Sequence, residues 1–298
     1  MARRFFFAAL QAGFAALALA PGGTPALAET LPQTASSHRV ITLSPHATEL
    51  IYAAGGGHYI VGTVSSSDFP EAAKHIPRVG DGILVNQERI IMLKPTVLVS
   101  WLRSGIALQI EALADRLGAQ MHYFRPLQLR DIPQAVRRLG RLLDTSETAD
   151  DAAGAMDARL DRLDAQYSGQ APVTVFIELG HSPLYTIGDD PLLNDALRTC
   201  GAVNIYATSG LPAPRIPIES VLVQKPQMLI TTGTPETAAD DMRKRWSAYG
   251  MEAAQLGHIH IADPDALYRP GPRLIDATEA ICAAVDAVRQ GKDVTEDP

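Results

Sequence analysis

An internal repeat is the feature that most limits how this chain can fold. Residues 88–99 read Glu-Arg-Ile-Ile-Met-Leu-Lys-Pro-Thr-Val-Leu-Val, and residues 219–230 read Glu-Ser-Val-Leu-Val-Gln-Lys-Pro-Gln-Met-Leu-Ile. The Glu, Lys and Pro recur at a constant offset of 131 residues, and the aliphatic positions recur with them. Each copy is typical of a short helix, ended by Lys-Pro, that leads into a buried strand. A repeat of this kind, within two halves of similar length, predicts two related lobes.

Strands and helices alternate around both copies of the repeat. The pattern predicts strands at 39–43, 59–64, 96–101, 120–124 and 173–178, and helices at 48–54, 88–93 and 107–117. Thr48 is a suitable N-cap for the first helix, and the three glycines at 55–57 end it. Strands that alternate with helices favour a parallel sheet covered on both faces. The sequence therefore predicts an α/β protein with two Rossmann-like lobes.

A strongly charged helical stretch separates the two halves. Within 145–167 the apolar residues Met156, Leu160 and Leu163 follow helical spacing. A helix of about 20 residues is about 30 Å long, enough to lie across two lobes and join them, although a surface helix within one domain fits the same pattern. The assigned segments are an N-terminal α/β lobe at 39–143, an interlobe backbone helix at 144–168 and a C-terminal α/β lobe at 172–291.

The first 28 residues are typical of a cleaved secretory signal. Arg3 and Arg4 precede an apolar run, and Ala26-Leu27-Ala28 offers a small-x-small cleavage site before Glu29. The apolar run is a little short for a membrane anchor, which is the alternative. We therefore expect a soluble mature chain in the periplasm. Cleavage leaves 24 of the 26 basic residues against 33 acidic ones, a net charge of −9, which argues against nucleic acid as a partner.

Cys200 and Cys282 are the only cysteines in the sequence. An even count in an exported chain suggests one disulfide, and two separate buried thiols are the alternative. Such a bond would close a loop of about 80 residues and stabilise the fold by roughly 4 kcal/mol in the chain-entropy treatment. A structural zinc site normally needs four ligands at close spacing, so two distant cysteines do not favour one.

The sequence lacks the motifs that mark common active sites. It has no G-x-S-x-G, no H-E-x-x-H, no P-loop and no dinucleotide fingerprint. Ser44 and His46 are close together, but residues so near in sequence rarely form a nucleophile–base pair. His258 and His260 lack the carboxylate or cysteine partner of a metal site. We expect a binding protein without a metal site rather than an enzyme, in which His46 or His181 could touch a ligand.

A set of motifs spans nearly the whole mature chain. In the first half these are R-V-I-T-L-S-P-x-x-T-E-L at 39–50, S-D-F-P at 67–70, N-x-E-R-I at 86–90, L-K-P at 93–95 and Trp101. In the second half they are Y-T-I-G at 185–188, C-G-x-x-N-I at 200–205, D-x-x-x-R-x-x-P-R at 265–273 and Cys282. In these motifs, their order and their spacing, the chain resembles the cobalamin-binding members of the periplasmic binding proteins with a long-helix backbone (class III).

The resemblance implies a fold, a ligand and a partner. Two α/β lobes would be joined by one long helix, with cobalamin (vitamin B12) or a related cobalt corrinoid in the cleft between them. Haem-binding and ferric-siderophore-binding proteins share much of the pattern and are the alternative. The protein would act as a monomer and deliver its ligand to the permease dimer of an ABC transporter at the inner membrane. Because one long helix is a stiff link, the lobes are expected to close little.

Individual residues match family positions with known roles. Four of them match positions that contact the corrinoid: Trp101, Tyr185, Asp265 and Arg269. Glu88 and Glu219 match the acidic residues that dock, one per lobe, onto arginines of the permease. Cys200 and Cys282 match a family disulfide.

Three aromatic cleft positions depart from the family pattern. By alignment, Ser66, Gly82 and Ala213 stand where the cobalamin-binding relatives carry Tyr, Trp and Trp, and we keep Ser66 as a candidate ligand-binding residue. Large flat rings supply much of the contact area for a macrocycle. The cleft is therefore expected to be wider or differently shaped, which leaves cobalamin, another corrinoid, haem and an iron chelate as ligands.

Overall fold

The structure is a computed structural model and describes residues 38–103 and 105–294; the expected signal peptide at 1–28 lies outside them. The first half contains β1 (Val40–Thr42), α1 (Pro45–Ala53), β2 (Ile60–Val64), β3 (Arg78–Gly80), α2 (Gln87–Leu93), β4 (Val97–Ser100), α3 (Ile106–Leu117), β5 (Gln120–Tyr123) and α4 (Asp131–Leu142). After α5 (Ser146–Tyr167) come β6 (Val173–His181), β7 (Leu184–Thr186), α6 (Pro191–Thr199), β8 (Ala202–Asn204), α7 (Ile218–Gln224), β9 (Met228–Thr232), α8 (Pro235–Ala248), α9 (Glu252–Gln255), β10 (Ile259–Ala262), α10 (Pro264–Leu267) and α11 (Arg273–Arg289). None of the helices among these residues is both long and apolar enough to cross a bilayer.

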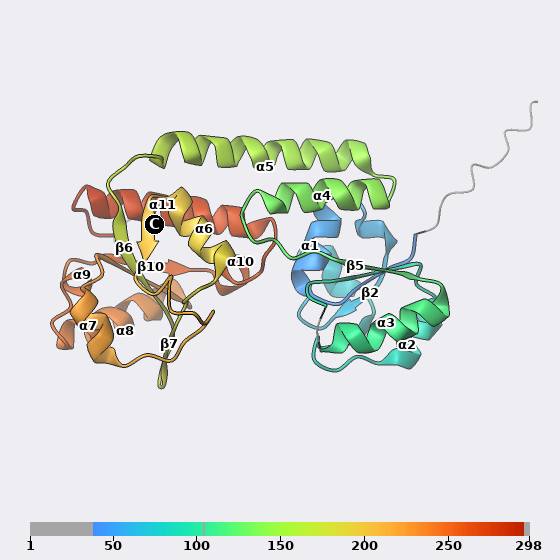
Figure 1. The fold of residues 1–298 in the computed structure, drawn as a ribbon, viewed down its shortest axis with the longest axis horizontal. Coiled ribbons are helices and arrows are strands. Elements are labelled where there is room, and N and C mark those ends of the chain that lie inside the picture. The colour runs from blue at the N-terminus through green and yellow to red at the C-terminus, as the bar shows by residue number, and fades with distance from the viewer. Residues whose placement is uncertain (1–37, 104, 295–298) are drawn as a thin grey trace, which may run out of the picture. The chain divides into compact units, whose positions relative to one another are not determined.

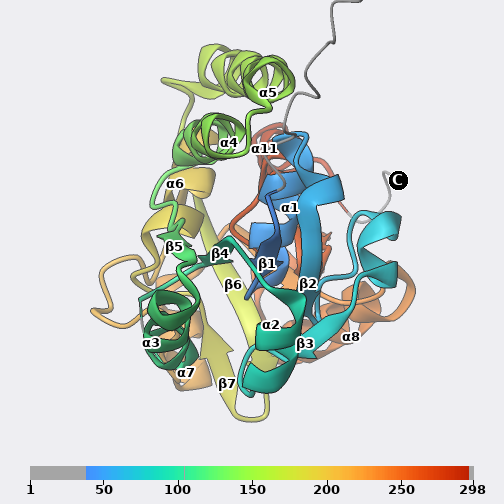
Figure 2. The same ribbon diagram turned by 90° about the vertical axis from the view of Figure 1, so that its right-hand side faces the viewer.

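The first half of the chain forms an all-parallel sheet with the strand order β3-β2-β1-β4-β5. Alternate residues of its strands are buried on opposite faces, so that Val97 and Val99 join one hydrophobic cluster and Leu98 joins another. A sheet buried on both faces needs helices on each side. Figures 1 and 2 show α1 and α4 on one side of this lobe and α2 and α3 on the other.

The second half repeats this arrangement. Strands β10, β9, β6 and β8 are parallel neighbours in that order, as are β5, β4, β1 and β2 in the first half. Helices α2 and α7 have seven residues each, precede β4 and β9, and end at lysines in the left-handed region, with φ of 47° at Lys94 and 46° at Lys225. The antiparallel strand β7, which extends β6 into a hairpin, lies outside the repeat. The two-lobed α/β fold is thus confirmed.

The structure corrects the sequence prediction at the start of the first helix. Helix α1 begins at Pro45 rather than after Thr48, and Ser44 is its N-cap residue. Proline suits the first helical position because the N–H that it lacks would be unpaired there anyway. Strands β3, β7 and β8 have three residues each, too few to give a periodic signal in the sequence.

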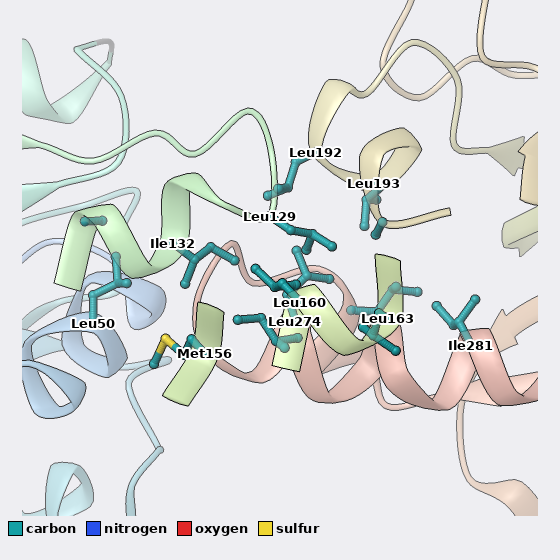
Figure 3. Packing of buried hydrophobic residues seen from close by; sticks show 14 of the residues in the cluster. Leu50, Leu129, Ile132, Met156, Leu160, Leu163, Leu192, Leu193, Leu274 and Ile281 are labelled. Carbon is teal, nitrogen blue, oxygen red and sulfur yellow. The ribbon is translucent and has the colours of Figure 1, made fainter. Parts of the chain in front are cut away.

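Helix α5 packs against both lobes. Its buried residues recur every three or four positions: Ala149, Ala153, Met156, Leu160, Leu163 and Tyr167. They share one hydrophobic cluster with residues of α1 and α4 in the first lobe and of α6 and α11 in the second. Figure 3 shows Met156, Leu160 and Leu163 among the side chains of Ile132 from α4 and Leu274 from α11. The two lobes are therefore joined by packing as well as by the chain itself.

Cys200 and Cys282 form the expected disulfide within the second lobe. The bond joins the end of α6 to the middle of α11, and both cysteines are completely buried. The joined residues are 82 positions apart. A cross-link over such a loop removes conformational freedom mainly from the unfolded chain, worth roughly 4 kcal/mol in the chain-entropy treatment.

Candidate ligand-binding cleft

A cavity of about 460 Å³ opens at the carboxyl ends of β1, β2 and β4. The strand order reverses between β1 and β4, so the loops that follow these two strands diverge and leave room for a ligand. Ser44 and His46 follow β1, Ser66 follows β2, and Trp101 follows β4. Asp81, Gly82 and Ile83, which follow β3, also line the cavity, and Tyr268, Arg269 and Pro270 contribute the wall from the second lobe. The cavity therefore lies between the lobes, where the fold class is expected to hold its ligand.

A smaller cavity of about 190 Å³ adjoins the first, because Trp101, Tyr268 and Pro270 line both. Its other lining residues also come from both lobes: Arg125, Pro126, Leu127, Ile187, Asp190, Pro191, Leu192, Leu193, Pro212, Ala213 and Leu267. Most of these side chains are apolar. Trp101 is 41% exposed, so its ring can be covered by a ligand that enters the cleft.

His46 supports Trp101 from within the first lobe. The two rings meet edge to face with centroids 5.5 Å apart, and His46 Nε2 is 3.2 Å from the Ser44 hydroxyl oxygen. Burial, and then the positive charge of Arg269, lower the pKa of His46 to about 3. The imidazole is therefore neutral near pH 7. The ring brings no charge into the cleft, and its Nε2 is already paired with Ser44.

A cluster of buried hydroxyl groups holds the loops under the cavity. Thr42, Thr48, Thr63 and Ser67 are 0% exposed. Five contacts of 2.6 to 3.0 Å between their oxygens connect β1, α1, β2 and the loop after β2. Each hydroxyl can donate and accept, so a closed cluster of this kind is rigid. It fixes the start of the loop that carries Asp68 toward the second lobe.

Arg273, at the start of α11, pairs with Glu49 of α1 across the two lobes. Its Nε and Nη2 atoms donate to the two carboxylate oxygens of Glu49 at 3.0 and 2.7 Å. The guanidinium carbon also lies 4.5 Å from the ring centroid of Phe69 in the first lobe. The Glu49 side chain is only 2% exposed. A carboxylate so deeply buried needs a charged partner, and here that partner comes from the other lobe.

Arg269 makes a second connection between the lobes. Its guanidinium donates to Asp68 of the first lobe at 2.6 Å and pairs with Asp265 of its own lobe at 2.6 Å. The hydrogen bond from Arg269 lowers the pKa of Asp68. Because two carboxylates compensate its charge, Arg269 can offer further N–H donors to the polar edge of a ligand without bringing an unpaired charge into the cleft.

The structure brings together some of the residues predicted to bind the ligand. Trp101, Arg269 and Ser66 line the same cavity, and Asp265 orients Arg269. Tyr185 lies elsewhere, on β7, where it is 39% exposed and lines neither of the two cavities. Contact of all five residues with a ligand stays a prediction.

The positions that depart from the family pattern all face the cleft. Ser66 and Gly82 line the larger cavity, and Ala213 lines the smaller one. The absence of three large rings there agrees with a more open cleft. A further cavity of about 420 Å³ lies between α7 and α9 on the second lobe and shares no lining residue with the cleft.

Three residues that connect the lobes carry no predicted role: Glu49, Asp68 and Arg273. Each belongs to a motif quoted above, namely T-E-L, S-D-F-P or the final P-R. The motifs therefore indicated that these residues matter, although not that they connect the lobes. The partners are 224 residues apart in one pair and 201 in the other. Contacts over such distances cannot be inferred from local patterns.

The pattern of the periplasmic binding protein family matches residues 40–266. The vitamin B12-binding protein of Pectobacterium carotovorum is 34% identical over 256 residues, or 85% of this chain and 90% of that protein. The crystal structure of the periplasmic vitamin B12-binding protein of Vibrio cholerae, 31% identical, matches 85% of this chain and 98% of its own with a TM-score of 0.77. A periplasmic haem-binding protein of Vibrio cholerae shares the fold at 20% identity, with a TM-score of 0.72 over 83% of this chain and 98% of its own. This chain therefore belongs to the periplasmic binding protein family and is a substrate-binding protein of an ABC importer, not an enzyme.

Proposed function

We propose that the protein captures cobalamin or a related corrinoid in the periplasm and delivers it to an ABC permease at the inner membrane. The observation that carries the proposal is the interlobe cleft around Trp101, with its apolar walls and compensated arginine. Relatives more than 30% identical over most of the chain are vitamin B12-binding proteins, which favours a corrinoid. A flat macrocycle buries much apolar area against an aromatic ring and needs only a few polar anchors.

The ligand can be identified by its absorption. The protein is produced with residues 1–28 and purified from the periplasm, and mass spectrometry should find a mature chain that begins at Glu29. Titration with cyanocobalamin should shift the visible bands of the corrinoid and saturate at one equivalent. Haemin and a ferric siderophore are titrated in parallel. Saturation by haemin or the siderophore without a response to cyanocobalamin would replace the corrinoid by that ligand.

Haem or a ferric chelate is the alternative ligand, and the open cleft positions favour it. Ala213 allows a direct comparison, because it is exposed and its φ lies outside the left-handed region. If a corrinoid occupies the cleft as in the relatives, Ala213→Trp should restore a ring contact and tighten cyanocobalamin binding by about tenfold, or about 1.4 kcal/mol. A weaker or unchanged affinity would mean that the ligand is placed differently.

Docking onto the permease is the second part of the proposal. Glu88 and Glu219 lie in the first turns of α2 and α7 and are exposed. Within the described part of the chain, neither carboxylate has an ion-pair or hydrogen-bond partner. A carboxylate in the first turn favours the positive end of the helix dipole, which explains one such residue. It does not require two at equivalent places on two lobes, whereas docking onto a dimer does.

The docking residues can be separated from simple helix caps. Glu88→Ala and Glu219→Ala should leave cyanocobalamin affinity and thermal stability nearly unchanged and should reduce cyanocobalamin uptake by cells. The double variant should transport less than either single one, and Glu→Arg should be worse than Glu→Ala because like charges would meet. Glu147→Ala is the matched control, since Glu147 is also exposed in the first turn of a helix. If the double variant took up cyanocobalamin at the wild-type rate, both glutamates would act only as helix caps.

A further inference from the structure

Each helix proposed to dock also exposes an apolar side chain one turn after its carboxylate. Met92 on α2 is 72% exposed and Val223 on α7 is 79% exposed. Each stands four residues after the glutamate of its helix, so the two side chains lie on one helix face. Single exposed apolar residues are normal on protein surfaces. The recurrence of the same pair, on both lobes and at the same offset of 131 residues, needs a further cause.

The two surfaces are equivalent in their backbone as well as in sequence. On each helix the residue two positions after the glutamate is completely buried, namely Ile90 on α2 and Val221 on α7. Both helices have the same length and the same left-handed end. The glutamate and the apolar residue are therefore presented to solvent in the same way in each lobe. Figures 1 and 2 show α2 and α7 on the side of the lobes that faces away from α5.

We propose that Met92 and Val223 are apolar anchors of permease docking, each set beside its carboxylate. The proposal rests on the docking function proposed above. Two equivalent patches in one chain fit a partner with two equivalent surfaces, as a dimer related by a two-fold axis provides. Each permease subunit would offer a basic side chain next to a shallow apolar pocket. The apolar contact would strengthen the ion pair by excluding water from it, as the surroundings of a binding hot spot do.

Charge argues against a second copy of this chain as the occupant of the patches. Pairing of these patches with each other would bring Glu88 or Glu219 against another carboxylate. Like charges at an interface are unfavourable, whereas a basic membrane protein surface matches both patches. The mature chain also carries a net charge of −9, which opposes self-association in general.

The test uses Met92→Ser, Val223→Ser and the double variant in the mature full chain. Binding is measured to the permease–ATPase complex of the source organism in nanodiscs, and cyanocobalamin affinity is measured separately. Each single variant should weaken permease binding by about three- to tenfold and the double variant further, with ligand affinity unchanged. Val203→Ser is the matched control, because Val203 on β8 is also exposed, at 49%, and lies on neither α2 nor α7. Permease binding by the double variant within twofold of wild type would overturn the proposal.

Parallel variants keep failure of this inference distinct from failure of the docking function. If Glu88→Ala and Glu219→Ala weaken permease binding while the apolar variants do not, docking stands and the anchors are rejected. If neither set has an effect, the docking surface itself lies elsewhere. Sedimentation of the wild type tests the other possible occupant, a second copy of this chain. A dimer that Met92→Ser dissociates would assign the patch to that second copy and overturn the proposal.

Discussion

Replacement of Glu49 by Gln should reveal how strongly the two lobes are tied together. Gln keeps the shape of the side chain and can still accept one hydrogen bond, but it removes the charge. In the wild type, Glu49 receives two hydrogen bonds from Arg273 and lies 3.5 Å from the guanidinium of Arg269. The Glu49 side chain is 2% exposed, and the two arginines are 15% and 12% exposed. Glu49→Gln therefore leaves two neighbouring cations with little water around them.

The expected loss in the free energy of unfolding is about 3 kcal/mol. Removal of one partner from a buried ion pair typically costs 3 to 5 kcal/mol. The lower end applies here because Asp68 and Asp265 still compensate part of the charge on Arg269. For a chain of this size, 1 kcal/mol corresponds to a shift in melting temperature of about 2 to 4 °C. The melting temperature of Glu49→Gln should accordingly fall by about 6 to 12 °C.

Differential scanning calorimetry of the mature chain at pH 7 measures this effect. The transition should also broaden, since both arginines come from the second lobe and the variant weakens the coupling between lobes. Glu111→Gln is the control: Glu111 also accepts two hydrogen bonds from an arginine, Arg103, but within one lobe and with that arginine 70% exposed. It should cost less than about 1 kcal/mol. Equal melting temperatures for the two variants would refute the idea of an interlobe ion pair.

Three further predictions concern the ligand, the disulfide and acid stability. Trp101→Ala should weaken ligand binding at least about tenfold while the melting temperature stays within a few degrees; wild-type affinity would place the site elsewhere. Replacement of Cys200 and Cys282 together by Ala should lower the free energy of unfolding by roughly 4 kcal/mol in denaturant titrations. The pKa of His46 is about 3 in the fold and about 6.5 in unfolded chains, so protons bind preferentially to the unfolded state. Stability present above pH 6.5 should fall by up to about 2 kcal/mol between pH 7 and pH 5, and His46→Gln should lose less over that range.

The sequence predicts the fold well because the fold depends on patterns that are local or repeated. The Glu…Lys-Pro repeat is read directly, and its two copies become α2–β4 and α7–β9. The spacing of Met156, Leu160 and Leu163 reports the buried face of α5 for the same reason, since helical period and burial are linked within one element. The start of α1 was misplaced because both Ser44 and Thr48 are suitable N-cap residues, and the signal from Pro45, which suits the first helical position after Ser44, was not weighed.

The cleft is only partly predictable from the sequence. Trp101 and Ser66 were assigned from the family resemblance, and the structure places both directly after strands, where ligands bind in parallel α/β sheets. The pairs Glu49–Arg273 and Asp68–Arg269 depend on how two separate lobes meet. No periodicity within either lobe encodes that contact. A motif such as S-D-F-P indicates that its residues matter but does not name the partner.

The two copies of the repeat match each other in some regions and differ in others, and the division fits the two proposed tasks of the protein. The repeat is kept at α2 and α7, where Glu88 and Met92 recur as Glu219 and Val223. It is lost at Trp101, which lines the cleft, since the same offset from Trp101 leads to Thr232 at the end of β9. The proposed docking onto a two-fold symmetric permease needs matching features on both lobes, whereas the proposed corrinoid ligand has different groups on its two faces and edges. A chain with both proposed tasks would keep its duplication on the outer helices and diverge around the ligand, as Trp101 and Thr232 do.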